Sequence, residues 1–142
     1  MCHPWTPKPF RAPDGTVPFE RFVDGLPDFK LAALDAAIES ILSARGIDLV
    51  RTEWLKALGK GLHEFRVRHD ADEIARMFVG RPRGAPAPRG RVLLRVFVHF
   101  HGQRQILLLG GYDKGDDPTQ RRQRLELAAA RRHLASFRGH HT

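Results

Sequence analysis

Two arginines stand on strand-like segments of the chain, in positions where their side chains could act together. Arg66 lies in GLHEFRVR and Arg95 lies in RVLLRVFVHF, and apolar residues alternate with polar ones in both segments. Because successive residues of a strand point to opposite faces, each arginine falls on the more polar face of its segment. If the strands pair, both guanidinium groups can reach one phosphate. The alternative is a solvated sheet surface on which the arginines pair with Glu64, Asp70 or Asp113.

Groups that could move a proton lie close to these arginines in the sequence. Lys114 follows two glycines in GGYDKG, where the missing side chains let backbone and ligand approach closely. It could hold the same phosphate or protonate a leaving oxygen. The candidate bases are Glu64 and His99, followed by His63 and Tyr112. A carboxylate among arginines is more often an ion-pair partner than a base, so we expect a structural role for Glu64.

The residue types that usually bind metals do not cluster in the sequence. His99 and His101 form an i, i+2 pair, and His140 and His141 follow near the end, but no third and fourth ligand stand at a typical spacing. Cys2 is the only cysteine, so neither an intramolecular disulfide nor a cysteine zinc centre can form. We therefore expect no metal and no cofactor.

The charge of the chain indicates a polyanionic partner. Lysine and arginine number 24 against 16 acidic residues, which gives a net charge of +8. Lysine occupies only positions 8, 30, 56, 60 and 114, so arginine carries most of this charge. Its planar group contacts two phosphate oxygens and stacks on bases, which favours nucleic acid over a membrane surface. The start of the chain has no signal-peptide pattern and no apolar run approaches membrane-spanning length, so we expect a cytoplasmic protein.

Hydrophobic periodicity predicts an α+β domain with a small antiparallel sheet. Helices are expected after Thr16, ending at Gly25, and from Asp28 to Arg45, with a further turn beginning at Thr52. Strands are expected at 62–68, 91–100 and 105–113, joined as a meander. A basic helix should run from Pro118 to Phe137, with Leu127, Ala130, Leu134 and Phe137 on its apolar face.

The composition of the remaining segments predicts tails at both ends of the domain and an insertion within it. Prolines at positions 4, 7, 9 and 13 predict a tail over 1–15, or at best an edge strand. The segment at about 70–90 is expected to be a loop insertion with a helical turn from Ile74 to Phe78. Its arginines at 81, 83 and 89 belong either to a solvated linker or to an RNA contact. Residues 139–142 form a short C-terminal tail.

The order of these elements and three strings resemble a known family. The strings are GLHEFRVR, then VLLRVFVHF with HGQRQILLLGGYDKGDDP, then ARRHLASF in a basic helix. Over residues 16–138 this pattern is similar to the phage-related HigB-like branch of the RelE/ParE toxin superfamily. The resemblance implies a RelE-like fold and the toxin of a type II toxin–antitoxin system. Such toxins are metal-independent endoribonucleases (mRNA interferases) that cleave mRNA, often on the ribosome, and a helix-turn-helix antitoxin silences them.

The resemblance also implies site residues. Glu64, Phe65 and Arg66 match the acidic, aromatic and basic end of the family's first catalytic strand, Arg95 matches the arginine of the next strand, and Lys114 matches the basic residue after the last. The chain departs from the pattern in having no C-terminal tyrosine, and Leu62 and Glu64 stand where lysines are usual. Candidate RNA-binding residues are Lys60, Arg68, Arg91, Tyr112, Arg121 and Arg122. The alternatives are a non-catalytic protein of the same fold that binds RNA, DNA or the ribosome, and a regulatory subunit that acts with an antitoxin.

Overall fold

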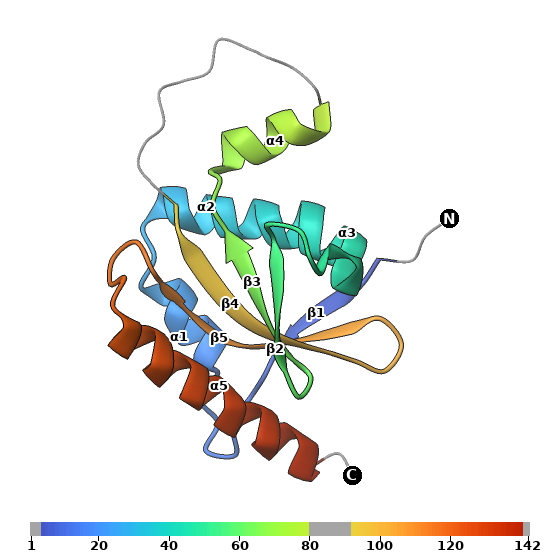
Figure 1. Cartoon of the computed structure of the whole chain (residues 1–142), viewed down its shortest axis with the longest axis vertical. Coiled ribbons are helices and arrows are strands. Elements are labelled where there is room, and N and C mark those ends of the chain that lie inside the picture. Colours follow the sequence, from blue (N-terminus) through green and yellow to red (C-terminus); the bar gives the residue numbers. More distant parts are fainter. Residues whose placement is uncertain (1–3, 80–91, 141–142) are drawn as a thin grey trace.

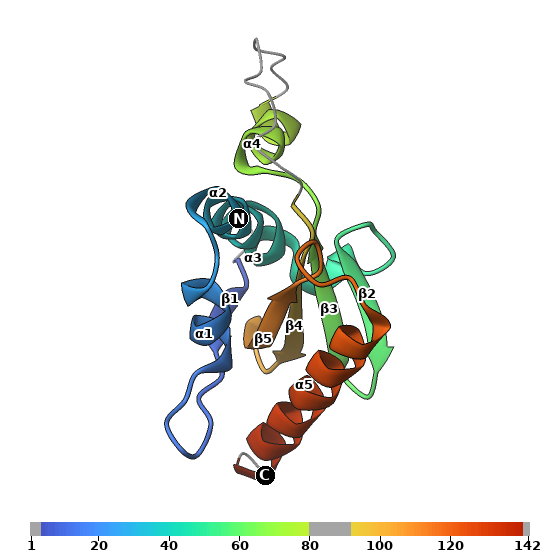
Figure 2. The same cartoon turned by 90° about the vertical axis from the view of Figure 1, so that its left-hand side faces the viewer.

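A computed structural model describes residues 4–79 and 92–140, which form one sheet with helices on both faces (Figure 1). The elements in chain order are β1 (Thr6–Pro9), α1 (Pro18–Asp24), α2 (Asp28–Ala37), the π turn η1 (Ile38–Leu42), α3 (Ser43–Arg45), the 3-10 turn η2 (Gly46–Leu49), β2 (Leu55–Gly59), β3 (Leu62–Val67), α4 (Ala71–Val79), β4 (Leu94–His101), β5 (Gln105–Asp113) and α5 (Gln120–His140). Figure 2 shows α1, α2 and α3 on one side of the sheet and α5 on the other.

The sheet has five strands in the order β1-β5-β4-β3-β2. Strands β2 to β5 form an antiparallel meander, and β1 pairs with β5 in parallel. The expected α+β class and the three-strand meander are confirmed. The expectation of a purely antiparallel sheet is wrong, because β1 makes it mixed and β2 extends it at the far edge.

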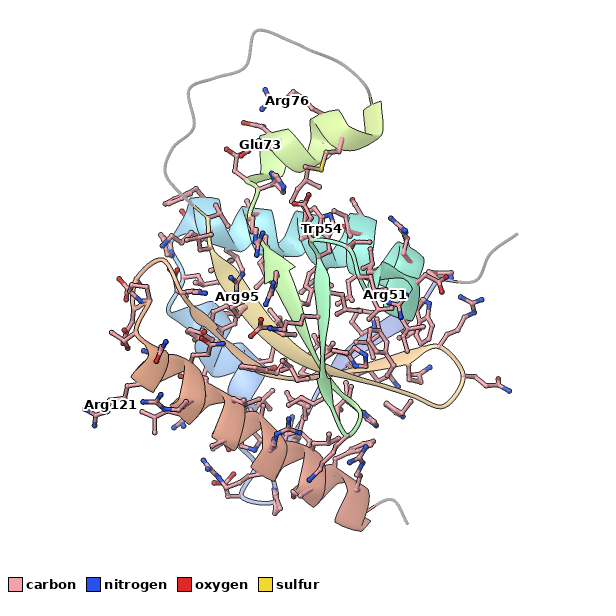
Figure 3. The ribbon with its side chains drawn as sticks, in the orientation of Figure 1. Arg51, Trp54, Glu73, Arg76, Arg95 and Arg121 are labelled. Carbon is pink, nitrogen blue, oxygen red and sulfur yellow. The ribbon has the colours of Figure 1, made fainter. Side chains whose placement is uncertain are left out.

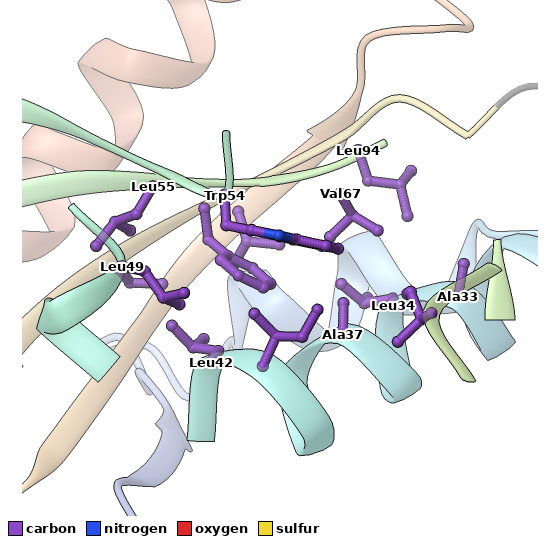
Figure 4. Close-up of a cluster of buried hydrophobic side chains, with 14 of the residues drawn as sticks. Ala33, Leu34, Ala37, Leu42, Leu49, Trp54, Leu55, Val67 and Leu94 are labelled. Carbon is purple, nitrogen blue, oxygen red and sulfur yellow. The ribbon is translucent and has the colours of Figure 1, made fainter. Parts of the chain in front are cut away.

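One face of the sheet packs on the N-terminal helices (Figure 4). The segment from Asp28 to Arg45 is helical throughout, with a π turn in its middle, and it ends at Gly46 as predicted. Its apolar stripe buries Leu34 and Leu42 completely against the sheet. Each such leucine contributes about 1.5–3 kcal/mol of hydrophobic stabilisation. This face therefore supplies the larger core and holds the strands in register.

The other face packs on α5, the basic C-terminal helix that the sequence predicts. The helix continues to His140, so the tail predicted at 139–142 is wrong over 139–140. Ala130 and Leu134 are buried against the sheet, with Leu127 and Phe137 packed beside them, as expected. On the sheet side the cluster contains Leu62, Phe97, Leu107, Leu109 and Tyr112. No helix in the ranges 4–79 and 92–140 is long and apolar enough to cross a membrane.

A bulge in β5 decides which residues face α5. Val98 pairs with Leu108 but Phe97 pairs with Gly110, so Leu109 is the extra residue. An inserted residue reverses the alternation of side chains beyond it. As a result Tyr112 lies on the same face as Leu109, although the two are an odd number of residues apart.

Two predicted segments differ from the structure. The helical turn expected from Thr52 is wrong, because Leu55–Gly59 forms strand β2 and Leu55 pairs with Phe65. The predicted tail is also wrong over Thr6–Pro9, which forms the edge strand left open as the alternative. Phe10 is buried and Trp5 packs edge-on against Phe100, so apolar contacts fix this segment in place. Prolines are tolerated there because an edge strand has backbone donors that need no partner.

The start of α1 also differs in detail from the prediction. Val17 rather than Thr16 is the N-cap residue of α1, and the Thr16 hydroxyl donates to Asp14. The helix begins at Pro18, which suits a first helical position because its missing N–H has no partner there. The position of α1 beside β5 is unaffected.

Helix α4 is longer than the predicted turn and begins with a reciprocal cap. Glu73 N donates to Asp70 Oδ1 at 2.8 Å, and Asp70 N donates to Glu73 Oε1 at 3.2 Å. This arrangement satisfies two backbone donors that a helix start leaves free. Ile74 fixes the helix onto α2. The rest of the insertion, with Arg81, Arg83 and Arg89, lies outside the described residues.

The histidine before α4 predicts a pH-dependent contribution to stability. His69 Nε2 lies 2.6 Å from Glu53 Oε1, and His69 Nδ1 lies 3.3 Å from Glu73 Oε2. Burial opposes the imidazolium charge, but the hydrogen bonds and charges of both glutamates outweigh it and raise the pKa of His69 above 6.5. The stabilisation is therefore complete below pH 6.5 and is lost as the pH rises through the raised folded pKa.

An NMR titration of the histidine rings checks this prediction. His69 should titrate above 6.5, and His133 should titrate below it because burial lowers the pKa of His133. In urea unfolding, His69→Gln should lose stability relative to the native chain only on the acidic side of the His69 midpoint. A midpoint for His69 at or below that of His133 would contradict the proposed pairing.

Gly46 predicts a steric limit on the docking of the N-terminal segment. A Cβ atom at this position would lie 2.3 Å from Cε2 and Nε1 of Trp5, and φ is +52°. Gly46→Ala should lower the free energy of unfolding by about 1–3 kcal/mol, because the indole must move. Gly15→Ala is the matched control, since φ is +90° there but no atom lies within 4 Å of the added Cβ. Equal losses in urea unfolding of the two variants would show that backbone strain alone matters at Gly46.

Candidate functional site

Three neighbouring strands place polar side chains in one row across the sheet. Arg66 of β3 pairs in register with Arg95 of β4, and Arg95 pairs with Tyr112 of β5. Paired residues lie on the same face of a sheet, and neighbouring strands are about 4.8 Å apart. This face is the one covered by α5. Figure 3 shows Arg95 over the strands between α2 and α5.

Glu64 lies beside this row, two residues before Arg66 on the same face of β3. Its side chain is buried, with a residue exposure of 2%, and Oε1 accepts a hydrogen bond from Arg66 Nε at 2.9 Å. The same oxygen lies 3.7 Å from Arg95 Nε. The expected structural role of Glu64 therefore has a geometric basis, because one carboxylate orients two guanidinium groups.

Two buried donors of the row have no hydrogen-bond partner within the described part of the chain. They are Arg95 Nη1 and the Tyr112 hydroxyl. Burial is the main cause that lowers the pKa of Arg95, and it also raises the pKa of Tyr112, so the phenol stays protonated and able to donate. Unpaired buried donors are uncommon in proteins and call for an explanation, such as a catalytic role or an acceptor that binds there. A phosphate oxygen is an acceptor of this kind.

Lys114 completes the group from the end of β5. Its backbone N–H donates to Leu93 O at 2.8 Å, which fixes the chain just beyond the strand. Burial lowers the pKa of Lys114, and the positive charges of Arg95, Arg66 and Arg68 lower it further. An ammonium group with a lowered pKa gives up its proton more readily. We call Arg66, Arg68, Arg95 and Lys114, whose positive charges act on one another, the basic cluster; Glu64 contacts two of them, Arg66 and Arg95.

The structure does not bring His99 or Lys60 to the basic cluster. His99 lies four residues from Arg95 along β4, about 13 Å at the usual rise per residue. Its Nδ1 lies 2.8 Å from Gly61 O, and its ring contacts His101 and Phe137. Lys60 occupies the turn between β2 and β3, where its carbonyl accepts from an α5 arginine. Neither residue can act on a ligand held by Arg66 and Arg95.

The remaining base candidate, His63, faces the opposite side of the sheet. It pairs with Val98, and its ring packs edge-on against Phe100 of the larger core. Its Nδ1 is buried without a hydrogen bond to the described residues, and burial lowers the pKa of His63. The sheet itself therefore separates His63 from the basic cluster.

The arginines at the start of α5 have different positions. Arg122 Nε donates to Glu126 at 2.7 Å, and its guanidinium lies 5.7 Å from the centre of the Tyr112 ring. It therefore closes the edge of the basic cluster. Arg121 is exposed and points away from the sheet (Figure 3). Arg91 lies outside the described residues.

Sequence reasoning did not anticipate the contribution of Lys30. Its amino group forms an ion pair with Asp113, the residue before Lys114. Asp113 Oδ1 also accepts from the backbone N–H groups of Gly115 and Asp116. This contact joins α2 to the end of β5, and no local sequence signal identifies it because the partners are 83 residues apart. It fixes the backbone from which Lys114 projects.

Comparisons of the chain with models of protein families, with curated proteins and with solved structures find no match. The relation to the RelE superfamily therefore stays a prediction from the residues. Among residues 4–79 and 92–140, no group of three or more histidine, cysteine, aspartate or glutamate side chains could hold a metal ion. The polar chemistry of the described site rests on arginine, lysine, tyrosine and one buried glutamate.

Proposed function

We propose that the protein is a metal-independent endoribonuclease that cleaves mRNA, with a RelE-like fold, and that it is the toxin of a type II toxin–antitoxin system of the HigB kind. The observation that carries the proposal is the basic cluster. Arg66 of β3 and Arg95 of β4 pair on one face of the sheet, and Lys114 follows directly after β5, where the charges of both arginines act on it. Their charges suit a phosphodiester, and the unpaired Arg95 Nη1 and Tyr112 hydroxyl provide further donors.

RNA can be cleaved by its own 2′-hydroxyl, which attacks the neighbouring phosphorus atom in line with the departing oxygen. The 2′-hydroxyl gives its proton to water as the 2′-O–P bond forms, the P–O5′ bond breaks to leave a 2′,3′-cyclic phosphate, and the 5′ oxygen takes a proton. Arg66 and Arg95 would neutralise the charge that grows on the non-bridging oxygens. Lys114, whose pKa is lowered, would supply the proton. Glu64 would keep the arginines in place, and orientation of the RNA backbone would supply much of the rate.

The proposed substrate sets the expected partners and location. With mRNA as its substrate, the protein would act in the cytoplasm, and a ribosome would present the RNA in a bent form. A helix-turn-helix antitoxin would silence the toxin by covering the basic cluster with acidic or helical elements.

One observation favours a second candidate function, non-catalytic binding to RNA, DNA or the ribosome. The carboxylate of Glu64, which lies among the arginines, accepts a hydrogen bond from Arg66 Nε at 2.9 Å and so is not free to take a proton. His99 and His63 do not reach the basic cluster. A site that binds phosphate without a free base can hold nucleic acid without cutting it. The regulatory subunit considered above belongs to this class.

Incubation of the purified chain with a defined mRNA separates the two candidates. The nuclease produces new 5′-hydroxyl ends and matching 2′,3′-cyclic phosphate ends, with and without ribosomes, and EDTA does not stop it. A protein that shifts the RNA in a gel but leaves every strand intact in both settings would overturn the nuclease proposal and support the binding protein. Brief induction in cells should likewise arrest growth only if the protein cuts.

A further inference from the structure

We propose that a pocket between α1, α2 and the end of β5 is a guanine-binding site. The inference rests on the proposed function in one respect: the guanine would belong to the nucleotide beside the cleaved phosphate. The pocket has a volume of about 370 Å³ and is lined by residues of α1, α2, β5 and α5. This volume falls in the range of pockets that hold small organic ligands.

The backbone of β5 provides one polar wall of the pocket. Strand β1 ends at Pro9, opposite Leu108, so residues 109–113 of β5 have no strand partner on that side within the described chain. Gly111, Tyr112 and Asp113 line the pocket at this edge, where the Asp113 carbonyl already accepts from the N–H groups of Asp116 and Asp117. The other outward-pointing N–H and C=O groups of the edge can bond a ligand as they would bond a strand. The edges of nucleobases carry matching donors and acceptors.

Apolar side chains provide a second wall beside the strand. Phe22 of α1 packs directly against Gly111, because a Cβ atom on Gly111 would be 2.9 Å from the phenyl ring, so no base fits between the two. Leu26 and Pro27 continue this wall toward α2. The part of the phenyl ring that lines the pocket offers an aromatic surface on which an unstacked RNA base can stack.

The charges around the pocket select the base. Lys30 and Asp113 neutralise each other, and Arg122 is held by Glu126. Of the charged lining residues, this leaves Asp116 and Arg21, both exposed and without a side-chain hydrogen bond to the described residues. Guanine presents two adjacent N–H donors for a carboxylate and two acceptors, O6 and N7, for a guanidinium. The other RNA bases do not offer both pairs, so this combination favours guanine.

The pocket lies next to the basic cluster without overlapping it. Tyr112 lines the pocket and is also the cross-strand partner of Arg95, one strand spacing from it. Arg122 lines the pocket and lies over the Tyr112 ring. A nucleotide whose base fills the pocket would therefore carry its phosphate toward Arg95 and Lys114.

Titration of the full chain with 5′-GMP and 5′-AMP, followed by NMR, tests the pocket without any cleavage. The native chain should bind GMP about tenfold or more tightly than AMP, with shifts at Gly111 and Phe22. Asp116→Asn and Arg21→Gln should each remove most of this preference. Both side chains are exposed, so the variants should keep the fold, and Asp72→Asn on α4 is the matched control that should change nothing. Equal affinity of the native chain for GMP and AMP would overturn the proposal.

Mapping of the cut sites separates this inference from the proposed function. The native chain should cut mainly beside guanine, and in Asp116→Asn the share of cuts beside guanine should fall toward the guanine content of the RNA. Cleavage without base preference, together with equal GMP and AMP binding, would refute the pocket and leave the nuclease intact. Selective GMP binding by a chain that cuts no RNA would uphold the pocket and refute the nuclease.

Discussion

Lys114→Ala should lower the rate of RNA cleavage about 100-fold or more while the melting temperature stays nearly unchanged. A positioned proton donor contributes about 10²–10⁴-fold to such a reaction. The side chain of Lys114 forms no hydrogen bond with described residues, and only its backbone holds the turn beyond β5. Its loss therefore removes a charge and a proton donor from the site but breaks no side-chain hydrogen bond to the described residues. The measurement is the single-turnover cleavage rate of the purified variant on a defined RNA.

Lys8→Ala provides the matched control for this prediction. Lys8 is an exposed lysine of the opposite edge strand β1, where it pairs with Leu107, so its removal changes the net charge equally but away from the basic cluster. It should leave the cleavage rate within about twofold, since an exposed charge outside the site contributes only weak, screened interactions. Full activity in Lys114→Ala, or equal losses in both variants, would remove Lys114 from the mechanism. Because Lys114 must be protonated to donate, the cleavage rate of the native chain should fall as the pH rises through the lowered pKa of Lys114.

Glu64→Ala should lower the free energy of unfolding by about 3–5 kcal/mol, the cost of removing one partner of a buried ion pair. Arg95 has an exposure of only 4% and already has one unpaired donor, so the change would leave a buried guanidinium without an anion. Arg66 would also lose its hydrogen bond at 2.9 Å. Urea unfolding of the variant and the native chain measures the difference.

A second substitution tests the physical cause of this loss. In Glu64→Ala/Arg95→Met the buried charge is gone, so a large part of the lost stability should return. The double variant should still be unable to cut RNA, since Arg95 is part of the basic cluster. The stability losses of Glu64→Ala and Arg95→Met alone provide the comparison. If the double variant lost as much free energy of unfolding as these two losses added together, the buried charge would not be the cause. Glu64→Ala with native stability would show that Glu64 does not hold the arginines.

The sequence predicted most elements of the fold because their patterns are local. The apolar stripe that puts Leu34 and Ile41 on one face needs only the helical period, and Gly46 ends the helix through its own backbone preference. The alternation in β3 and β4 likewise identified the faces of Arg66 and Arg95 before any pairing was known. The α+β class and the basic C-terminal helix could therefore be derived without coordinates.

The failures share a different cause, which is pairing between distant segments. The spacing of Trp54, Leu55 and Leu58 fits a helical turn, but pairing with β3 makes that segment a strand. Thr6–Pro9 is rich in proline, yet it pairs with β5, about 100 residues further along the chain. A strand preference that depends on a partner cannot be read from the segment alone.

The site divides in the same way. The sequence by itself determined the chemical groups: an arginine on each of two polar strand faces, a lysine after two glycines, and a strong excess of arginine over lysine. Only the tertiary structure decided which of these groups meet. The strand register sets Arg66 beside Arg95, the bulge at Leu109 turns Tyr112 toward them, and four residues of strand length keep His99 away. The physical reason is that side-chain type is a local property, whereas distance between side chains depends on hydrogen bonds formed across the whole sheet.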